Sequence, residues 1–204
     1  MQGGETIMEI SEWARDLEIE RGRKNTFFAE HWQSPIAPED RKRFKGLDYF
    51  PPDPNYRFEL ELHEHEEKRL VKMAYTKGQE RDFIRWGEFR FKVGDRECKL
   101  QAYRSNTEDE RLFILFRDAT SGKETYGAGR YLDVEPERDR TAEDKWSLDF
   151  NKAYNPWCVY SKDYTCPLVP QENSLEVAIP AGEKDYPLKE GLEFTSEGKG
   201  ACLQ

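Results

Sequence analysis

The chain has 204 residues, which is enough for one ordinary domain. Its 32 Lys and Arg against 41 Asp and Glu give a formal charge of -9, the wrong sign for a protein that binds a phosphate backbone, so the composition argues against nucleic-acid binding. A mean hydropathy of -0.97 is typical of disordered chains, but aromatic residues make up 13% of this one and can supply a core.

The sequence shows no membrane-spanning run and no signal peptide, so we expect a soluble, cytoplasmic protein with no membrane partner. No stretch approaches the roughly 18 apolar residues that a membrane span requires. The first twenty residues lack the basic start and apolar run of a signal peptide. Charged residues make up 36% of the chain, a share that resembles the ion-pair-rich surfaces of thermophile proteins.

The N-terminal part of the chain has a helical hydrophobic period. Apolar residues recur there at the spacing of one helix face: Ile10, Trp13, Ala14, Leu17, Phe28 and Trp32. This spacing predicts an amphipathic helix over residues 9–32, packed through Trp13, Leu17 and Phe28. A short second helix is expected to open at Pro38 and to end by Gly46.

From residue 56 the period changes to two, which is typical of strands. Phe58, Leu60 and Leu62 share one face, while Glu59 and Glu61 share the other. Further short strands follow, with a hairpin turn at residues 94–95. We predict an antiparallel sheet over residues 56–135, with a core face that includes Phe58, Leu60, Leu62, Leu100, Phe113 and Leu115.

The predicted fold is mainly β (α+β): an antiparallel β-barrel or sandwich with the N-terminal helices packed on it. No helical pattern alternates with the strands, which argues against a doubly wound parallel sheet. We expect a single domain over residues 1–190, made of a helical arm (9–46) and a β-domain (56–190). Residues 149–183 read as an ordered loop with a strand at 175–179, and residues 191–204 as a flexible tail.

Neither histidines nor cysteines predict a metal site. The alternation places His63 and His65 on the charged face, at a solvated hairpin end. The four cysteines contain no C-x2-4-C pair. Cys158 and Cys166 lie eight residues apart in a Pro-rich loop, where a disulfide and two buried free thiols both stay open.

The segment after residue 149 is dense in Asn, Tyr and Pro, and it has two interpretations. Its amides either bond to backbone groups in turns or rim a pocket together with the strand at residues 127–131. In the pocket interpretation Arg130 is an anion clamp close to Tyr154, Asn155 and Glu172, with Glu172 as its internal partner if no ligand is bound. The candidate ligand-binding residues are Arg130, Tyr131, Asn151, Tyr154, Asn155, Tyr164, Glu172, Asn173 and Glu183.

Two functions follow from these two interpretations. The first is binding of, or action on, a small polar or anionic metabolite in that pocket. The second is a non-catalytic interaction or scaffold module whose loop is structural. No motif assigns a reaction, a catalytic residue, a cofactor or an oligomeric state.

Four segments of the chain are long enough to compare with known families: RFKGLDYFPPDPNYRF, DATSGKETYGAGRYLDV, LDFNKAYNPWCVYSKDYTCPLVPQENSLEVAIPAGEK, and the opening helix with HWQSPIAPEDR. Over roughly residues 10–190 the chain resembles the domain-of-unknown-function family numbered 1684. That family consists of uncharacterised bacterial and archaeal proteins, so the resemblance implies a prokaryotic source and no particular reaction.

By this resemblance, the family pattern falls on Gly129, Arg130, Tyr131, Asp149, Asn151, Tyr154, Asn155, Cys158, Tyr164, Cys166, Pro167, Glu172, Asn173, Gly182 and Glu183. Trp157 stands where members of the family carry a small residue or Pro. This departure implies different packing around Cys158.

Overall fold

The computed structural model describes residues 7–186, so the expected tail at 191–204 lies outside the described residues. Its helices are α1 (Ile7–Glu30), α2 (Pro38–Arg41) and α3 (Pro136–Asp139), with 3-10 turns η1 (Pro54–Tyr56), η2 (Phe150–Lys152), η3 (Trp157–Val159) and η4 (Gln171–Asn173). The strands are β1 (Arg57–Leu60), β2 (His63–Ala74), β3 (Glu80–Val93), β4 (Arg96–Arg104), β5 (Leu112–Phe116), β6 (Arg130–Val134) and β7 (Trp146–Asp149).

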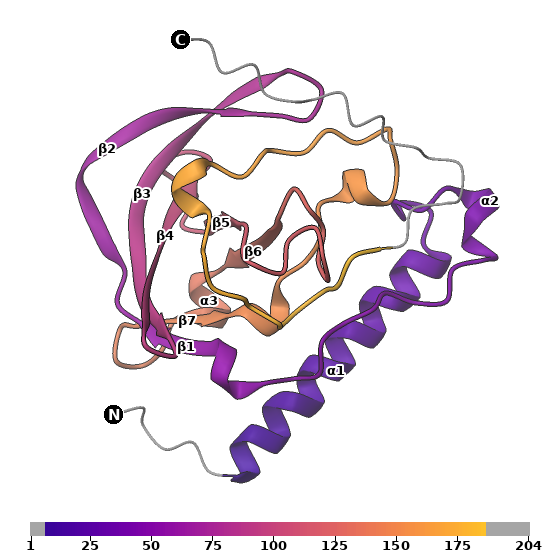
Figure 1. Cartoon of the computed structure of the whole chain (residues 1–204), viewed down its shortest axis with the longest axis horizontal. Coiled ribbons are helices and arrows are strands. Elements are labelled where there is room, and N and C mark those ends of the chain that lie inside the picture. The colour runs from indigo at the N-terminus through magenta and orange to yellow at the C-terminus, as the bar shows by residue number, and fades with distance from the viewer. Residues whose placement is uncertain (1–6, 187–204) are drawn as a thin grey trace.

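The strands form two antiparallel sheets. The larger sheet has the order β2-β3-β4-β5-β6, and β1 pairs with β7 in a second sheet of two strands. Figure 1 shows the long curved strands β2 and β3 on one side of the molecule and α1 on the other, with the chain after β7 running between them. The mainly β class with a helical N-terminus is confirmed, and the strands of residues 7–186 do not close into a barrel.

The alternation in β1 is confirmed, but its partner differs from the prediction. Phe58 is buried and Glu59 is exposed, as the period of two requires. Phe58 pairs with Leu148 of β7 rather than with the next strand along the chain. The expectation of one sheet over residues 56–135 is therefore wrong at this end, because the chain leaves the first pairing at Leu60 and starts another at His63.

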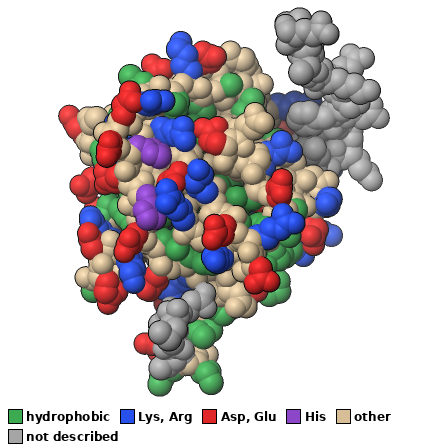
Figure 2. All heavy atoms as spheres, turned by 60° about the vertical axis from the view of Figure 1, so that its left-hand side comes forward, with side chains coloured by type: hydrophobic (Ala, Val, Ile, Leu, Met, Phe, Trp, Pro, Cys, Tyr) green, Lys and Arg blue, Asp and Glu red, His purple; other side chains and the backbone are tan. Residues whose placement is uncertain are grey.

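Residues 63–69 belong to β2, so the expected hairpin end is also wrong. β2 is the outermost strand of the large sheet, and a charged sequence protects such an edge from pairing with another chain. The Nε2 atom of His65 lies 2.7 Å from Oε1 of Gln101, and His63 is exposed. Figure 2 shows acidic and basic side chains mixed over this face, with histidine among them.

Both faces of the large sheet are buried at β5, β6 and the second half of β4. Leu112, Ile114 and Phe116 of β5 pack in the main core with Leu100. Leu115 and Phe113 point to the opposite face, where they pack in a second cluster that also contains Tyr131 and Cys166. Placing Phe113 and Leu115 on the face of Leu100 was therefore wrong, because an unbroken apolar strand carries no pattern that tells one face from the other.

The segment at 175–179 is ordered but is not the predicted strand. Its contacts with the turn after β5 are single backbone hydrogen bonds: the amide of Leu175 donates to the Arg117 carbonyl at 2.7 Å, and the amide of Ala119 donates to the Val177 carbonyl at 2.9 Å. It covers one end of the main core, to which Ile179 contributes.

Helix α1 packs on the body largely as predicted. Leu17 and Phe28 are buried and Trp13 is half-buried. Trp32 lies beyond the end of the helix and is 78% exposed, so the predicted helix was two residues too long there. The guanidinium of Arg21 is buried and donates to the carbonyls of Phe50 and Asn151, which fastens α1 to the start of the loop after β7.

Candidate functional site

A cavity of about 410 Å³ opens between the second face of the large sheet and the loop after β7. Its walls are mainly aromatic, and we call it the aromatic cavity. The aromatic side chains are Tyr75, Phe83, Phe113, Tyr131, Tyr154, Trp157 and Tyr164. Asp109, Arg111 and Asp133 supply charge, and Cys166 supplies a thiol.

The inner wall of this cavity is formed by side chains of β5 and β6, and the pairing of these strands determines where they point. Phe113 pairs with Asp133, and Leu115 pairs with Tyr131, across β5 and β6. Because alternate residues of a strand share a face, Tyr131 and Asp133 both point into the cavity. The ring of Tyr131 contacts the rings of Phe113 and Tyr154 edge-on, with centroids 5.1 and 5.9 Å apart. Such edge-to-face contacts fix the orientation of the rings.

The polar end of the cavity is a pair formed by Tyr154 and Asp133. The Tyr154 hydroxyl donates to Oδ2 of Asp133 at 2.5 Å. Burial, together with the charge of Asp133, raises the pKa of Tyr154 well above that of an ordinary phenol, so the hydroxyl keeps its proton. The other oxygen, Oδ1, lies 3.9 Å from the Arg111 guanidinium, and the Asp133 side chain is 27% exposed. One face of this carboxylate is therefore open to a further donor.

A second cavity of about 240 Å³, which we call the polar cleft, lies on the other side of Asp133 and Tyr154. It is lined by Leu17, Glu20, Arg21, Lys24, Tyr49, Asp133, Glu135, Arg138, Asn151, Lys152, Ala153, Tyr154 and Glu183. Asp133 and Tyr154 line both spaces, so this pair separates them.

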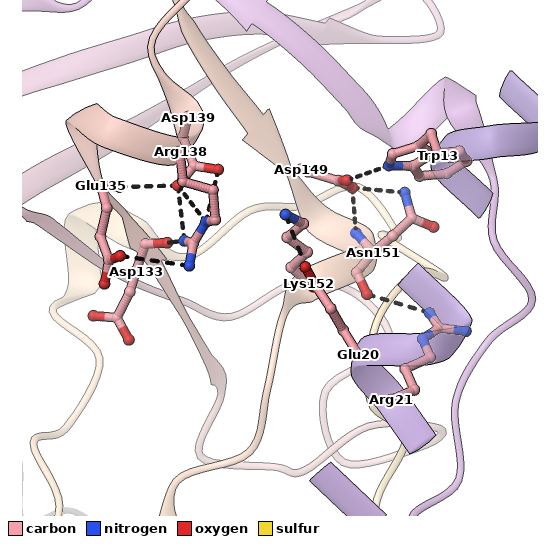
Figure 3. A network of polar contacts seen from close by, with 10 residues as sticks. All are labelled: Trp13, Glu20, Arg21, Asp133, Glu135, Arg138, Asp139, Asp149, Asn151 and Lys152. Atoms are coloured by element: carbon pink, nitrogen blue, oxygen red, sulfur yellow. Dashed lines mark hydrogen bonds and ion pairs between the residues drawn. The ribbon is translucent and has the colours of Figure 1, made fainter. Parts of the chain in front are cut away.

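The basic side chains of the polar cleft are paired with other groups of the protein. Figure 3 shows Arg138 folded against Asp139, which it contacts at 2.7 Å, and donating to the Asp133 carbonyl at 2.8 Å. Lys152 faces Glu20 at 3.9 Å (Figure 3). Lys24 donates to Glu183. Since each cation has an internal partner, the cleft offers an incoming anion little unpaired charge.

Glu183 and Asn151 line the polar cleft, but their side chains form hydrogen bonds with other parts of the protein. The Glu183 carboxylate is buried and accepts hydrogen bonds at 2.8 Å from the Tyr160 hydroxyl and from the amide of Asn155. The side chain of Asn151 accepts from the amide of Asp53 and donates to the Asp53 carbonyl, both at 2.8 Å. These bonds hold the loop after β7 against the rest of the protein.

Arg130 does not lie at a ligand surface. Its side chain is 1% exposed, and Nη2 contacts Oδ2 of Asp118 at 2.8 Å. The guanidinium also donates to the carbonyls of Ile179, Ala181 and Glu183. With its donors taken up inside the protein, Arg130 is unavailable as an anion clamp.

The expected pairing of Arg130 with Glu172 is wrong. Glu172 is exposed and accepts a hydrogen bond from the Tyr103 hydroxyl at 3.1 Å. The internal carboxylate that pairs with Arg130 is Asp118, in the turn that follows β5. Glu172 thus does not join Arg130, whereas Tyr154 pairs with Tyr131 next to Arg130, and Asn155 and Arg130 both bond to Glu183. Tyr154 alone among the four predicted residues lines the aromatic cavity.

The side-chain amides of the two remaining residues, Asn173 and Asn155, form hydrogen bonds with backbone groups. Asn173 lies between β4 and β5, where its Oδ1 accepts from the amide of Gln101 at 2.7 Å and its Nδ2 donates to the carbonyls of Gln101 and Leu115. Asn155 donates to the carbonyl of Lys184 at 2.7 Å. Both side chains thus form hydrogen bonds with backbone groups that are not paired with a neighbouring strand.

Of the predicted residues, Tyr131, Tyr154 and Tyr164 line the aromatic cavity. The sequence interpretation missed Asp133 and Arg111, which supply its charge. Asp133 could have been found, because it stands two residues after Tyr131 on a strand and so shares its face. Arg111 and Asp109 come from the loop between β4 and β5, which no sequence pattern joins to β6.

Two negative findings concern residues 7–186. None of the helices there is long and apolar enough to cross a membrane. The same residues contain no group of three or more His, Cys, Asp or Glu side chains placed to hold a metal ion.

Comparison with known proteins identifies the family. A model of the family described as proteins of unknown function (DUF1684) matches residues 42–184. The solution NMR structure of an uncharacterised protein of Haloarcula marismortui shares 39% identity with this chain. The similarity covers 88% of this chain and 97% of that one, with a TM-score of 0.67. A search of curated proteins gives no match. The chain belongs to the DUF1684 family.

Proposed function

We propose that the protein binds a small organic ligand in the aromatic cavity, with Asp133 as the polar anchor. The observation that carries this proposal is the half-open carboxylate of Asp133 at the end of an aromatic space of about 410 Å³. Spaces of roughly 300 to 1,000 Å³ with apolar walls and a few convergent polar groups are typical of small-molecule sites.

The charge of the cavity selects the class of ligand. Two acidic side chains, Asp109 and Asp133, line the cavity together with one basic side chain, Arg111. The guanidinium of Arg130 is paired with Asp118 and does not line the cavity. Aromatic faces attract cations, and a carboxylate at the end of such a space adds to that attraction. The ligand that fits is a small amine or a cationic heteroaromatic compound rather than the anionic metabolite that the sequence suggests.

A scaffold role is the second candidate function. Asn151, Asn155, Asn173 and Glu183 all direct their side chains to internal partners, as a purely structural loop would do. Under this alternative the aromatic cavity takes up no small molecule.

Ligand-observed NMR with a set of small amines and cationic heteroaromatic compounds tests the proposal. Each compound is paired with a neutral or anionic analogue of the same shape. We expect the cations to bind and their analogues to bind at least tenfold more weakly, since 1.4 kcal/mol of lost ionic interaction corresponds to a factor of ten. Binding should be lost in Asp133→Asn.

The matched control is Asp82→Asn. Asp82 is exposed on β3, next to Phe83 of the cavity, and its alternation places it on the opposite face. This variant removes the same charge from the same sheet and should bind as the parent does. Equal binding by Asp133→Asn and the parent, or no binding by any of the cations, would overturn the proposal.

A further inference from the structure

Two cysteines, Cys158 and Cys166, are in contact beside the aromatic cavity. Cys158 lies in η3, and Cys166 precedes the isolated bridge between Tyr75 and Pro167. The backbone amide of Cys158 donates to the sulfur of Cys166 at 3.3 Å. Both residues are free cysteines in the cluster around Tyr131. The loop therefore brings together the two sulfurs that the sequence left as either a disulfide or a pair of thiols.

The two sulfurs are not equivalent. A hydrogen bond from the Cys158 thiol and the backbone amides of Cys158 and Trp157 lower the pKa of Cys166 below that of an ordinary thiol. The same contact, together with burial, raises the pKa of Cys158. Because the backbone amide of Cys158 donates to the Cys166 sulfur, a negative charge on the pair is stabilised at Cys166, and the thiolate is the nucleophilic form of cysteine.

The two thiols also differ in their access to the cavity. Cys166 is one of the residues that line it, although only 7% of its surface is exposed. Cys158 is half-buried and is not among the lining residues. A small molecule in the cavity therefore meets Cys166, and Cys158 reaches that molecule only through its contact with Cys166. This is the order of an attacking thiol and a resolving thiol.

We propose that Cys166 and Cys158 form a redox-active pair that reduces a small two-electron oxidant, a hydroperoxide or a low-molecular-weight disulfide, admitted through the aromatic cavity. This activity goes beyond the proposed ligand binding, because it needs the cavity as an entrance and does not need Asp133 as an anchor.

The chemistry balances with either oxidant. With a hydroperoxide, the Cys166 thiolate attacks the terminal oxygen, the O–O bond breaks, and Cys166 becomes a sulfenic acid. The alkoxide or hydroxide that leaves takes up a proton from water. Cys158 then attacks that sulfur, the S–S bond forms, and water leaves. With a disulfide, Cys166 forms a mixed disulfide and releases one thiolate, and attack by Cys158 releases the second. Two thiols are oxidised to one disulfide in both cases.

The remaining cysteines serve as controls. The Cys98 thiol donates to the carbonyl of Arg96 in its own hairpin, and burial raises its pKa. Cys202 lies outside the described residues. A parent for the experiments is therefore the chain with Cys98→Ser and Cys202→Ser, which leaves only the pair.

The experiment treats this reduced parent at pH 7 with hydrogen peroxide in one arm and oxidised glutathione in the other, and follows intact mass and peptide maps. We expect loss of two hydrogen atoms and a cross-link between residues 158 and 166, formed at least about fivefold faster than free glutathione reacts, because the thiolate fraction of Cys166 is larger. Reaction in one arm alone supports the proposal and identifies which oxidant the cavity admits. No faster reaction in either arm overturns it.

Two variants separate the roles of the sulfurs. Cys158→Ser should stop at the first product, a sulfenic acid that dimedone traps or a stable mixed disulfide with glutathione. Cys166→Ser should show neither product, and a first adduct on Cys158 would contradict the proposal. Competitive labelling of the unmutated chain with iodoacetamide gives the same order of reactivity without relying on the folding of a variant. Asp82→Asn, at an exposed residue of β3, should keep this reactivity. The thiol reaction is followed by mass and amine binding by NMR, so failure of the redox proposal is distinguishable from failure of the ligand proposal.

Discussion

The hydroxyl of Tyr154 donates to the carboxylate of Asp133 at 2.5 Å, and this one hydrogen bond separates the aromatic cavity from the polar cleft. Tyr154 comes from the loop after β7, whereas Asp133 belongs to β6. The two backbones also pair, because Tyr131 and Tyr154 exchange hydrogen bonds at 2.9 and 3.0 Å. The loop therefore extends the edge of the large sheet and carries its aromatic residues over the sheet face.

Removing this hydroxyl with Tyr154→Phe should lower the free energy of unfolding by about 1.5 to 3 kcal/mol, the usual contribution of a hydrogen bond to a charged group. Urea denaturation followed by fluorescence measures the loss. The control is Tyr75→Phe in the same cavity, since the Tyr75 hydroxyl makes no hydrogen bond within the described part of the chain. A Tyr154 variant as stable as the Tyr75 variant would show that the bond contributes nothing.

The buried ion pair between Arg130 and Asp118 is predicted to be structural. Arg130→Met leaves the Asp118 carboxylate buried without its cation, which should cost about 3 to 5 kcal/mol. Combining it with Asp118→Asn should cost less than the sum of the two single changes, because the uncompensated charge is then gone. Additive losses in thermal denaturation would argue that the two side chains are not coupled.

Asn173 should contribute more to the free energy of unfolding than a loop residue usually does. Its side chain makes three hydrogen bonds to the backbones of β4 and β5, so Asn173→Ala leaves buried polar groups unpaired. We expect a loss of about 3 kcal/mol. Asn106→Ala is the comparison, because Asn106 bonds backbone amides in an exposed turn and should cost about 1 kcal/mol. Similar losses for both variants would contradict this role of Asn173.

The anchoring of α1 can be tested at Trp13, with Trp32, which lies beyond the end of the helix, as the comparison. Trp13 is half-buried, and its indole donates to Oδ2 of Asp149 at 2.8 Å, so Trp13→Ala should cost about 2 kcal/mol rather than the 3 to 5 of a fully buried ring. Trp32 is exposed, and Trp32→Ala should change the midpoint of chemical denaturation very little. An unchanged midpoint for the Trp13 variant would mean that this part of α1 does not pack on the body.

Alkaline unfolding should be steep. Burial raises the pKa of Tyr131, Tyr154 and Tyr160 far above the ordinary phenol value, and burial with the neighbouring Cys158 raises that of Tyr126 to about 12. Each raised pKa contributes stability that is fully present below about pH 10, the pKa of an unfolded tyrosine, and is lost as the pH rises toward the folded value.

Phenolate absorbance and circular dichroism measured together test this pH dependence. The buried phenols should ionise in the same transition in which the circular dichroism signal is lost. Ionisation of most of the phenols near pH 10 with the fold intact would show that these hydroxyls are open to solvent.

Sequence periodicity determined the class of the fold and several of its elements. The helical spacing of Leu17 and Phe28 predicted α1, and the alternation of Phe58 with Glu59 predicted which side of β1 is buried. These features depend on neighbours within one turn of helix or a few residues of strand, and the order of the residues carries that information directly.

Only the tertiary structure decided which distant groups meet. Nothing in the sequence pairs Arg130 with Asp118 rather than Glu172, or places Arg111 beside Asp133. Nothing in an unbroken apolar strand separates the face of Phe113 from that of Ile114. A hydrogen bond or ion pair selects its partner by the position of the backbone in space, and in an irregular loop such as residues 150–186 that position follows from the packing of the whole chain. The period of the sequence therefore determined the elements, whereas packing decided the cavity, the meeting of its two thiols and the internal use of Arg130.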